Sequence, residues 1–230
     1  YVQSIFENQK IRYTHSGVLS SATAMDKILS KEIFIKNNIL TPHFIKYDFK
    51  KISKNKIIKK IEKKLNFPVV IKPVSEGSSV DVFICAKKNF IKNLNKLVKY
   101  KEVLIEQYIG GREIQVAILG KKKLGAIELR PKRKFYDYKA KYSTKAKTEH
   151  LIPVDLPLKK MNKVLGIALK AHKLLKCRGV TRSDFKFYKN KFYLLEINTQ
   201  PGMTKLSLIP EIAAYKGISF INLIELLLKD

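Results

Sequence analysis

Two pairs of strand-like segments in the C-terminal half constrain the fold of this chain most strongly. Residues 113–119 and 124–129 are apolar segments joined by a short polar stretch, and residues 180–187 and 192–197 form a second pair. Apolar, β-branched segments separated by a few turn-forming residues predict antiparallel hairpins. The rest of the chain must therefore fold around two hairpins.

Helical and strand-like segments alternate in the remainder. Apolar spacing predicts five helices, over residues 20–37, 52–65, 89–99, 158–175 and 220–228. In the first helix the apolar set is Ala24, Ile28, Phe34 and Ile35, and Ser219 is expected to cap the last helix. Further strands are expected over residues 44–47, 69–71, 80–85 and 103–107.

The length and composition fit an α+β fold with two lobes. The chain has 230 residues, and a domain usually has about 100–200. Hydrophobic residues make up 45% and charged residues 29%, as in globular proteins. The pattern changes from helix-rich to hairpin-rich near Val103, so we expect a lobe boundary near residues 100–106.

Several features indicate a protein of the reducing cytoplasm. No apolar run approaches the roughly 18 residues of a membrane span, and no secretory signal opens the chain. Cys85 and Cys177 are isolated, which disfavours a disulfide scaffold or a cysteine zinc site. The chain begins with Tyr1 rather than Met, so we expect its natural start to lie outside this sequence.

The charge balance allows two interpretations. The chain has 47 basic and 19 acidic residues, a formal net charge of +28, which would attract polyanions such as nucleic acids. However, only six of the 47 are arginines, the residue best suited to recognising phosphates and bases. The lysines are spread through every segment. This distribution indicates that lysine has replaced other solvent-exposed residues through drift in amino-acid composition, rather than forming a nucleic-acid-binding surface. We therefore expect no specific nucleic-acid partner.

The second hairpin carries polar residues inside otherwise apolar strands. Because strand side chains alternate, Arg182 and Asp184 share a face, as do Glu196 and Asn198. A turn at residues 189–191 would place Asp184 opposite Glu196 to within a residue. Two carboxylates and an amide oxygen suit Mg²⁺, whereas an ion pair of Arg182 with one carboxylate is the alternative.

Two loops could bind an anionic substrate. Lys72 ends a strand before the small turn at residues 75–79, whose backbone N–H groups could hold phosphate oxygens. Taken alone, this turn favours an ordinary hairpin turn over a phosphate site. Residues 131–153 form a long polar segment rich in lysine and tyrosine, which could be a closing lid or a solvated loop. Together with the carboxylates, these features indicate a nucleotide-using enzyme.

Six ordered stretches resemble the D-alanine–D-alanine ligases of the ATP-grasp superfamily. The resemblance runs from about Ile11 to the C-terminus, and the six stretches are SGVLSSATAMDK, VIKPVSEGSSV, GREIQVAILG, YDYKAKY, GVTRSD and LEINTQPGMT. It implies two α+β lobes that grip ATP between them. Residues 16–105 would form the central lobe and residues 106–230 the C-terminal lobe, with residues 131–153 as the lid.

The family's activity implies the reaction and its partners. Its members join two D-alanines through an acyl phosphate, using ATP and two Mg²⁺ (or Mn²⁺) ions, and supply peptidoglycan precursor. They are homodimers at full length, and no membrane association is expected. Residues 1–15 would be a remnant of an N-terminal substrate-binding lobe. The alternatives are another ATP-grasp carboxylate–amine ligase, or a basic nucleic-acid-binding or inactive remnant.

The resemblance also assigns roles at matching positions. Lys27 and Lys72 would contact the phosphates of ATP, and Glu113 its ribose. Other nucleotide contacts would come from Glu106, Tyr108, Ile109, Phe135 and Leu195. The second substrate would contact Ser207 and Leu208. The metal ligands would be Asp184, Glu196 and Asn198.

The catalytic groups implied by the family lie on three segments. Arg182 and the Gly202 N–H would stabilise the tetrahedral oxyanion. Ser78 and Tyr142 would hold the lid closed, and Lys141 would reach the transferred phosphate. Lys139 departs from the family pattern, which commonly has an acidic residue there.

Overall fold

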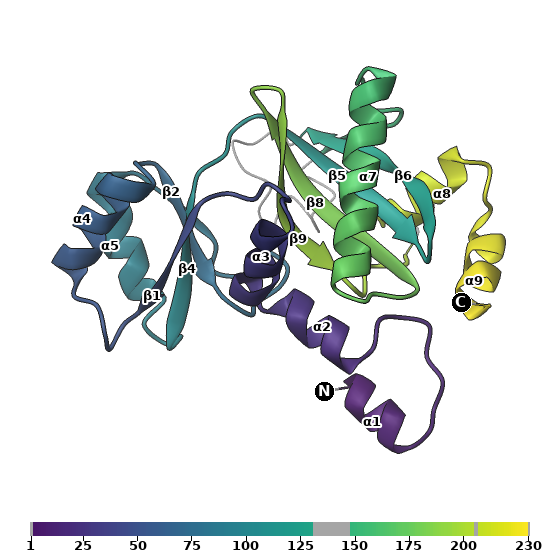
Figure 1. Cartoon of the computed structure of the whole chain (residues 1–230), viewed down its shortest axis with the longest axis horizontal. Coiled ribbons are helices and arrows are strands. Elements are labelled where there is room, and N and C mark those ends of the chain that lie inside the picture. The colour runs from purple at the N-terminus through teal and green to yellow at the C-terminus, as the bar shows by residue number, and fades with distance from the viewer. Residues whose placement is uncertain (1, 131–147, 205–206, 230) are drawn as a thin grey trace.

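The computed structural model describes residues 2–130, 148–204 and 207–229, and it shows an α+β fold built on two antiparallel sheets (Figure 1). The first sheet has four strands in the order β1-β4-β2-β3, and the second has five in the order β7-β6-β5-β8-β9. Within the described residues, none of the helices is long and apolar enough to cross a membrane.

The four-stranded sheet is covered by two amphipathic helices. Its strands are β1 (Phe44–Asp48), β2 (Val69–Pro73), β3 (Phe83–Cys85) and β4 (Glu102–Gln107). The helices α4 (Lys54–Lys64) and α5 (Lys87–Lys96) lie on one face (Figure 1). Their buried side chains, such as Ile57 and Phe90, pack on Ile71 and Ile105 of the sheet, while their many lysines face solvent.

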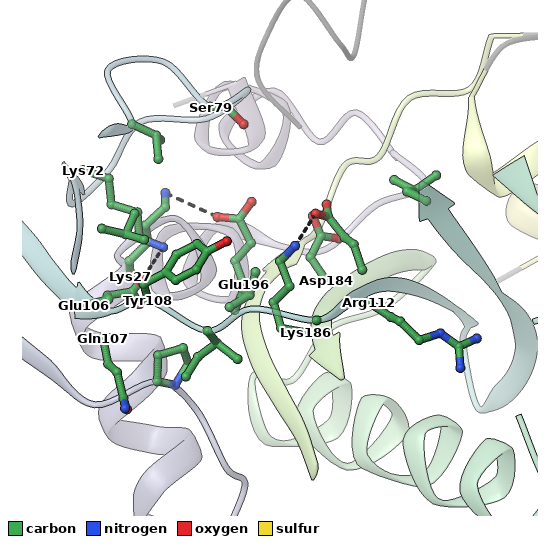
Figure 2. Close-up of a pocket in the computed structure, with 18 of the residues that line it drawn as sticks. Lys27, Lys72, Ser79, Glu106, Gln107, Tyr108, Arg112, Asp184, Lys186 and Glu196 are labelled. Atoms are coloured by element: carbon green, nitrogen blue, oxygen red, sulfur yellow. Dashed lines mark hydrogen bonds and ion pairs between the residues drawn. The ribbon is translucent and has the colours of Figure 1, made fainter. Parts of the chain in front are cut away.

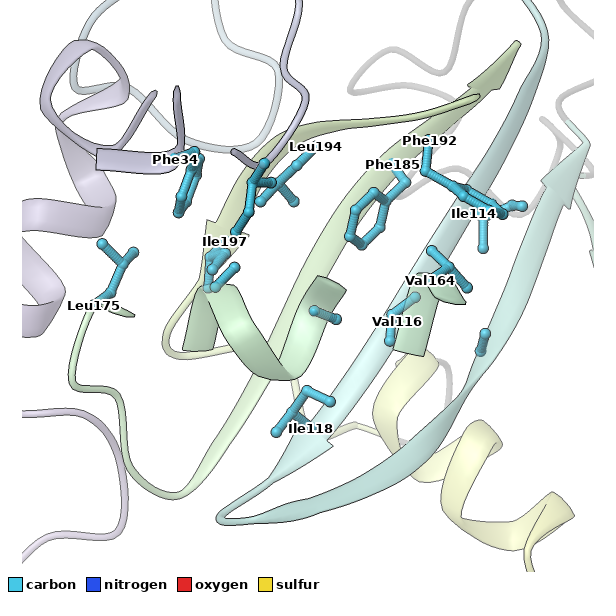
Figure 3. Packing of buried hydrophobic residues seen from close by; sticks show 14 of the residues in the cluster. Phe34, Ile114, Val116, Ile118, Val164, Leu175, Phe185, Phe192, Leu194 and Ile197 are labelled. Carbon is cyan, nitrogen blue, oxygen red and sulfur yellow. The ribbon is translucent and has the colours of Figure 1, made fainter. Parts of the chain in front are cut away.

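The five-stranded sheet has a helical layer on each face. Its strands are β5 (Arg112–Leu119), β6 (Lys122–Arg130), β7 (Glu149–Leu151), β8 (Val180–Tyr188) and β9 (Lys191–Asn198). The alternation along β5 sends Ile114, Val116 and Ile118 toward α7 (Leu158–Leu174), as Figure 3 shows for part of this core. Ala117 and Leu119 pack instead with α8 (Leu208–Tyr215) and α9 (Phe220–Leu228).

The prediction of a single helix over residues 20–37 is wrong. The structure has two helices there, α2 (Val18–Met25) and α3 (Lys27–Lys36). Asp26 interrupts the helix and caps α3, its Oδ1 accepting hydrogen bonds from the backbone N–H groups of Ile28 and Leu29 at 2.9 Å each. Ala24, Ile28 and Phe34 are buried as expected, whereas Ile35 is 51% exposed. The N-terminal residues form α1 (Val2–Asn8).

Three other expectations need correction. The strand expected over residues 80–85 is reduced to β3, because Ser78, Ser79 and Asp81 adopt positive φ angles that continue the preceding turn. The segment at residues 131–153 contains a strand, β7, at its C-terminal end. Helix α8 was not anticipated.

The two predicted hairpins are confirmed. Lys189 and Asn190, both with positive φ, form the two-residue turn between β8 and β9. This turn alone would pair Asp184 with Leu195, but a β-bulge between Asp184 and Phe185 shifts the register by one residue. Asp184 therefore lies opposite Glu196, and Arg182 opposite Asn198. The carboxylates therefore face each other across neighbouring strands, as the period-two argument predicted.

Helix α3 connects the two sheets. Phe34 packs in the core between α7 and the five-stranded sheet, and α3 contacts both β9 and α7. Three positions before Phe34 on α3, Lys31 forms an ion pair with Glu106 near the end of β4. The division of the chain at residues 105–106 stays a prediction.

Replacing Gly111 with alanine should destabilise the fold. Gly111 immediately precedes β5 and has φ +85°, and an added Cβ would lie 2.3 Å from the carbonyl oxygen of Phe187. Because the backbone must shift, we expect the free energy of unfolding to fall by about 2 kcal/mol or more. Urea denaturation followed by circular dichroism measures the change.

Gly166→Ala in α7 is the matched control, since an added Cβ there meets no atom within 4 Å. Alanine is favoured over glycine inside a helix, so this variant should gain about 0.5–1 kcal/mol. Equal effects of the two substitutions would contradict the strain assigned to residue 111.

Candidate active site

A cavity of roughly 400 Å³ lies between the two sheets, a size typical of small-molecule sites (Figure 2). The four-stranded sheet contributes Val70, Lys72 and Glu106, and the turn after β2 contributes Gly77 and Ser79. The five-stranded sheet contributes the opposite wall, which includes Arg112, Glu113, Glu128, Asp184, Lys186, Leu195 and Glu196. Lys27 of α3, Gln107 at the end of β4, and Tyr108 and Ile109 of the segment between the sheets also line the cavity.

One carboxylate binds two buried lysines at the edge of this cavity. Oε1 of Glu106 lies 2.7 Å from Nζ of Lys31, and Oε2 lies 2.6 Å from Nζ of Lys72. All three residues are less than 9% exposed. Nζ of Lys31 also donates a hydrogen bond of 2.6 Å to the Thr41 hydroxyl. We call Glu106, Lys31 and Lys72 the Glu106 cluster; it joins α3, β2 and β4.

Burial works against the charges of the Glu106 cluster. Desolvation lowers the pKa of Lys31 to about 8, and the carboxylate of Glu106 partly offsets this effect. Burial raises the pKa of Glu106, but the charges of Lys31 and Lys72 outweigh it and leave that pKa below its ordinary value. The carboxylate therefore stays ionised at neutral pH and helps to keep Lys31 protonated.

Lys27 extends the positive charge toward the second sheet. Its Nζ donates to the Glu76 carbonyl at 2.5 Å and lies 3.6 Å from Oε2 of Glu196 (Figure 2). Desolvation lowers the pKa of Lys27, while Glu196 raises it. Lys27 thus links the turn after β2 to the carboxylates of the five-stranded sheet.

The acidic residues of β8 and β9 have the chemistry of a divalent-cation site. Asp184 and Glu196 are cross-strand partners, and the Asn198 amide oxygen accepts a hydrogen bond from the Gln200 N–H at 3.1 Å. Among the described residues, no group of three or more His, Cys, Asp or Glu could hold a metal, so a three-oxygen set here depends on Asn198. Two carboxylates and one amide oxygen are hard donors that fit Mg²⁺ or Mn²⁺.

Arg182 also takes part in this region. Its Nε and Nη2 atoms bind the two carboxylate oxygens of Asp184 at 2.8 and 3.1 Å. The ion pair that the sequence left as an alternative is therefore present in the structure. It occupies only one of the two carboxylates, so it does not exclude a cation on Glu196 and Asn198.

The nucleotide-contact candidates lie together around the cavity. Tyr108 is 37% exposed, whereas Ile109 is buried, and both line the cavity beside Leu195. Glu113 lies deeper on β5, where its Oε2 is 2.9 Å from Nζ of Lys186.

The turn after β2 contains two consecutive residues in the left-handed region. Ser78 and Ser79 follow one another with φ angles of +52° and +59°. Asp81 anchors the turn through Nζ of Lys99 and the hydroxyl of Tyr100, each 2.8 Å from its Oδ2, and these bonds lower the pKa of Asp81. Such a turn can direct backbone N–H groups at phosphate oxygens.

The candidates at the C-terminal loop lie outside the cavity lining but close to each other. A Cβ on Gly202 would lie 2.8 Å from the hydroxyl oxygen of Ser207, so the backbone of Gly202 packs against this side chain. Ser207 precedes α8, whose first residue, Leu208, is buried. Phe135, Lys141 and Tyr142 fall outside the described residues.

Two cavity-related residues were missed. Lys31 follows Lys27 by four positions and lies on the same side of α3, a spacing that a helical projection would reveal. Lys186 follows Asp184 by two positions on β8, and the same alternation that paired Arg182 with Asp184 indicates it.

The comparisons with known proteins identify the class and then the family. Residues 34–229 match the family model described as "D-ala D-ala ligase C-terminus". The whole chain is 66% identical over 230 residues to a D-alanine–D-alanine ligase of Pelagibacter ubique (strain HTCC1062) and covers 75% of that relative. The chain belongs to the D-alanine–D-alanine ligase family.

Solved structures agree with this placement. The D-alanine–D-alanine ligase of Bacillus anthracis superposes with a TM-score of 0.87 at 36% identity, covering 99% of this chain and 74% of that one. The structure of the Bacillus anthracis enzyme complexed with ATP gives a TM-score of 0.84 at 31% identity, covering 99% and 72%.

Glu106→Gln should destabilise the chain strongly, because it leaves two buried lysines without their shared carboxylate. We expect a loss of about 3–5 kcal/mol in the free energy of unfolding at pH 7, measured by urea denaturation. Lys31 without Glu106 would titrate at lower pH than in the parent chain. The folded variant then binds fewer protons than the unfolded chain, so the deficit should shrink as the pH rises from 7 to 9.

Glu102→Gln is the control on the same strand. Glu102 pairs with Lys46 at 2.7 Å, but the lysine side chain is 51% exposed. An exposed pair contributes less than about 1 kcal/mol, so this variant should stay close to the parent at both pH values. Similar losses of unfolding free energy in both variants would show that the Glu106 cluster stabilises the fold no more than an exposed ion pair does.

Proposed function

We propose that this chain carries the ATP-dependent, ADP-forming ligation of two D-alanines to D-alanyl-D-alanine. The observation that carries the proposal is the cavity itself, which places Lys72 of the four-stranded sheet and Lys27 of α3 opposite the paired carboxylates of the five-stranded sheet. Membership of the D-alanine–D-alanine ligase family supports the same reaction. The two sheets would belong to the two lobes that grip ATP.

ATP would bind along the cavity from the connecting segment to the carboxylates. The adenine would lie against Glu106, Tyr108, Ile109 and Leu195, and the ribose beside Glu113. The positive groups of Lys27 and Lys72 would then face the phosphates, with Phe135 and Lys141 of the lid contributing further contacts.

Asp184, Glu196 and Asn198 would hold Mg²⁺ or Mn²⁺, which when bound neutralises the phosphate oxygens and favours phosphoryl transfer. Lys27 bridges toward Glu196, which positions a cationic side chain beside the same region. The lysines and the carboxylates therefore cooperate in orienting the terminal phosphate.

The chemical logic is activation of a poor electrophile. A carboxylate oxygen of the first D-alanine attacks the terminal phosphorus of ATP, and the bond to ADP breaks, giving an acyl phosphate. The amine of the second D-alanine then attacks the acyl carbon. The C–O bond to phosphate breaks, the nitrogen loses a proton, and phosphate and dipeptide are formed.

Several groups of the chain would act on the second step. Arg182 and the Gly202 N–H would stabilise the negative charge on the tetrahedral oxygen. The N-terminus of α8 at Ser207 and Leu208 would receive the carboxylate of the second D-alanine. Ser78 and Tyr142 would tie the lid closed and keep water away from the acyl phosphate.

The cellular role follows from the product. D-alanyl-D-alanine is a building block of peptidoglycan, so we place the activity in the cytoplasm. The proposed units are residues 1–15, 16–105 and 106–230. A homodimer is the proposed assembly of the full-length enzyme.

Product analysis tests the proposal directly. The chain with a restored N-terminal substrate-binding lobe, and the 230-residue chain beside it, are incubated with Mg-ATP and D-alanine, D-serine or D-lactate. Mass spectrometry identifies the products, and the version with the restored lobe carries the expectation. We expect ADP and D-alanyl-D-alanine. Products containing only another acceptor would indicate a different carboxylate–amine ligase, and salt-sensitive DNA binding without ATP turnover would favour the nucleic-acid alternative.

Glu196→Gln should abolish turnover while leaving the fold intact. The substitution removes one metal-ligand charge, and the Glu196 side chain is 32% exposed, so the packing cost is small. We expect the rate of ADP formation to fall by about a hundredfold or more. A coupled assay for ADP measures the rate, and thermal unfolding checks the fold.

Glu62→Gln serves as the control for the loss of one carboxylate. Glu62 lies on α4, away from the cavity, in an exposed pair with Lys87. Its rate should match that of the parent chain. An unchanged rate for Glu196→Gln would refute the metal assignment.

A further inference from the structure

Lys31 is a charged residue that the proposed reaction leaves without a role. Its side chain is fully buried, and it is absent from the residues that line the cavity, so it cannot touch a nucleotide bound there. Its Nζ instead lies 2.7 Å from Oε1 of Glu106 and 2.6 Å from the Thr41 hydroxyl. A lysine is costly to bury, so a compensating benefit is expected.

The charge count of the Glu106 cluster suggests what that benefit is. The single carboxylate of Glu106 receives two ammonium groups, one on each oxygen, which leaves a formal charge of +1. Without Lys31, Glu106 and Lys72 would form a neutral pair. The positive charge that Lys72 presents to the cavity would then be cancelled by its own partner.

We propose that Lys31 is a positioning residue that neutralises Glu106 from behind and so leaves the charge of Lys72 available to the phosphates of the nucleotide. The inference rests on the proposed binding of ATP and deepens it. Lys31 also holds the Glu106 carboxylate in one orientation, because Thr41 and Glu106 fix its Nζ from two directions. Lys72 in turn keeps a single position at the cavity wall.

The buried surroundings allow the charge of Lys31 to influence anion binding in the cavity, although Lys31 does not line it. The members of the Glu106 cluster are shielded from water, and Coulomb interactions there are screened much less than at the surface. The charged groups that act on Lys31 are Glu106 on β4, Lys72 on β2 and Glu196 on β9, and its hydroxyl partner is Thr41 before β1. Removing one positive charge from this set should therefore weaken the binding of anions more than that of neutral ligands.

The test compares Lys31→Met with the parent chain across adenosine, AMP, ADP and ATP. Methionine keeps a long side chain and removes the charge. We expect ATP affinity, measured by isothermal titration calorimetry, to fall about tenfold, with a smaller loss for AMP and little change for adenosine. A merely structural role would weaken all four ligands by a similar factor.

Two control variants separate charge from packing. Thr41→Val removes the hydroxyl partner of Lys31 and keeps the charge, so the ratio of ATP to adenosine affinity should stay near that of the parent. Lys46→Met removes an exposed charge on β1 that pairs with Glu102, and it should also leave this ratio unchanged. Thermal unfolding with and without adenosine verifies that each variant is folded.

The outcomes distinguish this inference from the proposed function. A parent chain that fails to bind ATP would overturn both. Parent binding together with an unchanged ATP-to-adenosine ratio in Lys31→Met would overturn the role of Lys31 and leave the proposed function intact. A ratio that falls in Lys31→Met but not in the two controls would support it.

Discussion

The rest of the site depends on the carboxylate of Glu106 and the two lysines that it binds. These three buried side chains come from β4, α3 and β2, so their ion pairs hold a helix and two strands in one arrangement. Because α3 also packs on the five-stranded sheet through Phe34, the same interaction relates the two sheets to each other. The cavity lies at this junction. The ion pairs of Glu106 with Lys31 and Lys72 hold the side chains of its wall on the four-stranded sheet in place.

The opposite wall of the cavity carries two neighbouring carboxylates among basic residues. Asp184 and Glu196 are cross-strand partners, and two carboxylates at this spacing are favourable only near cations. Lys27 lies between the walls, bonded to the turn after β2 and 3.6 Å from Glu196. A highly charged ligand such as a nucleotide with divalent cations matches this alternation of charge, whereas an apolar ligand does not.

Much of this arrangement follows from local sequence rules, and the exceptions have physical causes. Strand alternation and an expected turn at residues 189–191 predicted that Asp184 faces Glu196 to within a residue. The structure reaches this pairing through a two-residue turn and a β-bulge between Asp184 and Phe185, which the sequence did not reveal. The single helix expected over residues 20–37 failed because Asp26 can bond the next backbone N–H groups and start a new helix, a competition that apolar spacing does not detect. Lys31 was missed because a buried lysine resembles a surface lysine in sequence, and its partners are far away along the chain.

The most direct test of the account is a crystal structure of this chain with Mg²⁺ and a non-hydrolysable ATP analogue. The account predicts the nucleotide between the two sheets, with its phosphates against Lys27 and Lys72 and a cation on Asp184, Glu196 and Asn198. It also predicts that the pair between Lys31 and Glu106 is retained. A nucleotide bound elsewhere, or a Glu106 carboxylate turned away from Lys31 when the cavity is filled, would contradict it.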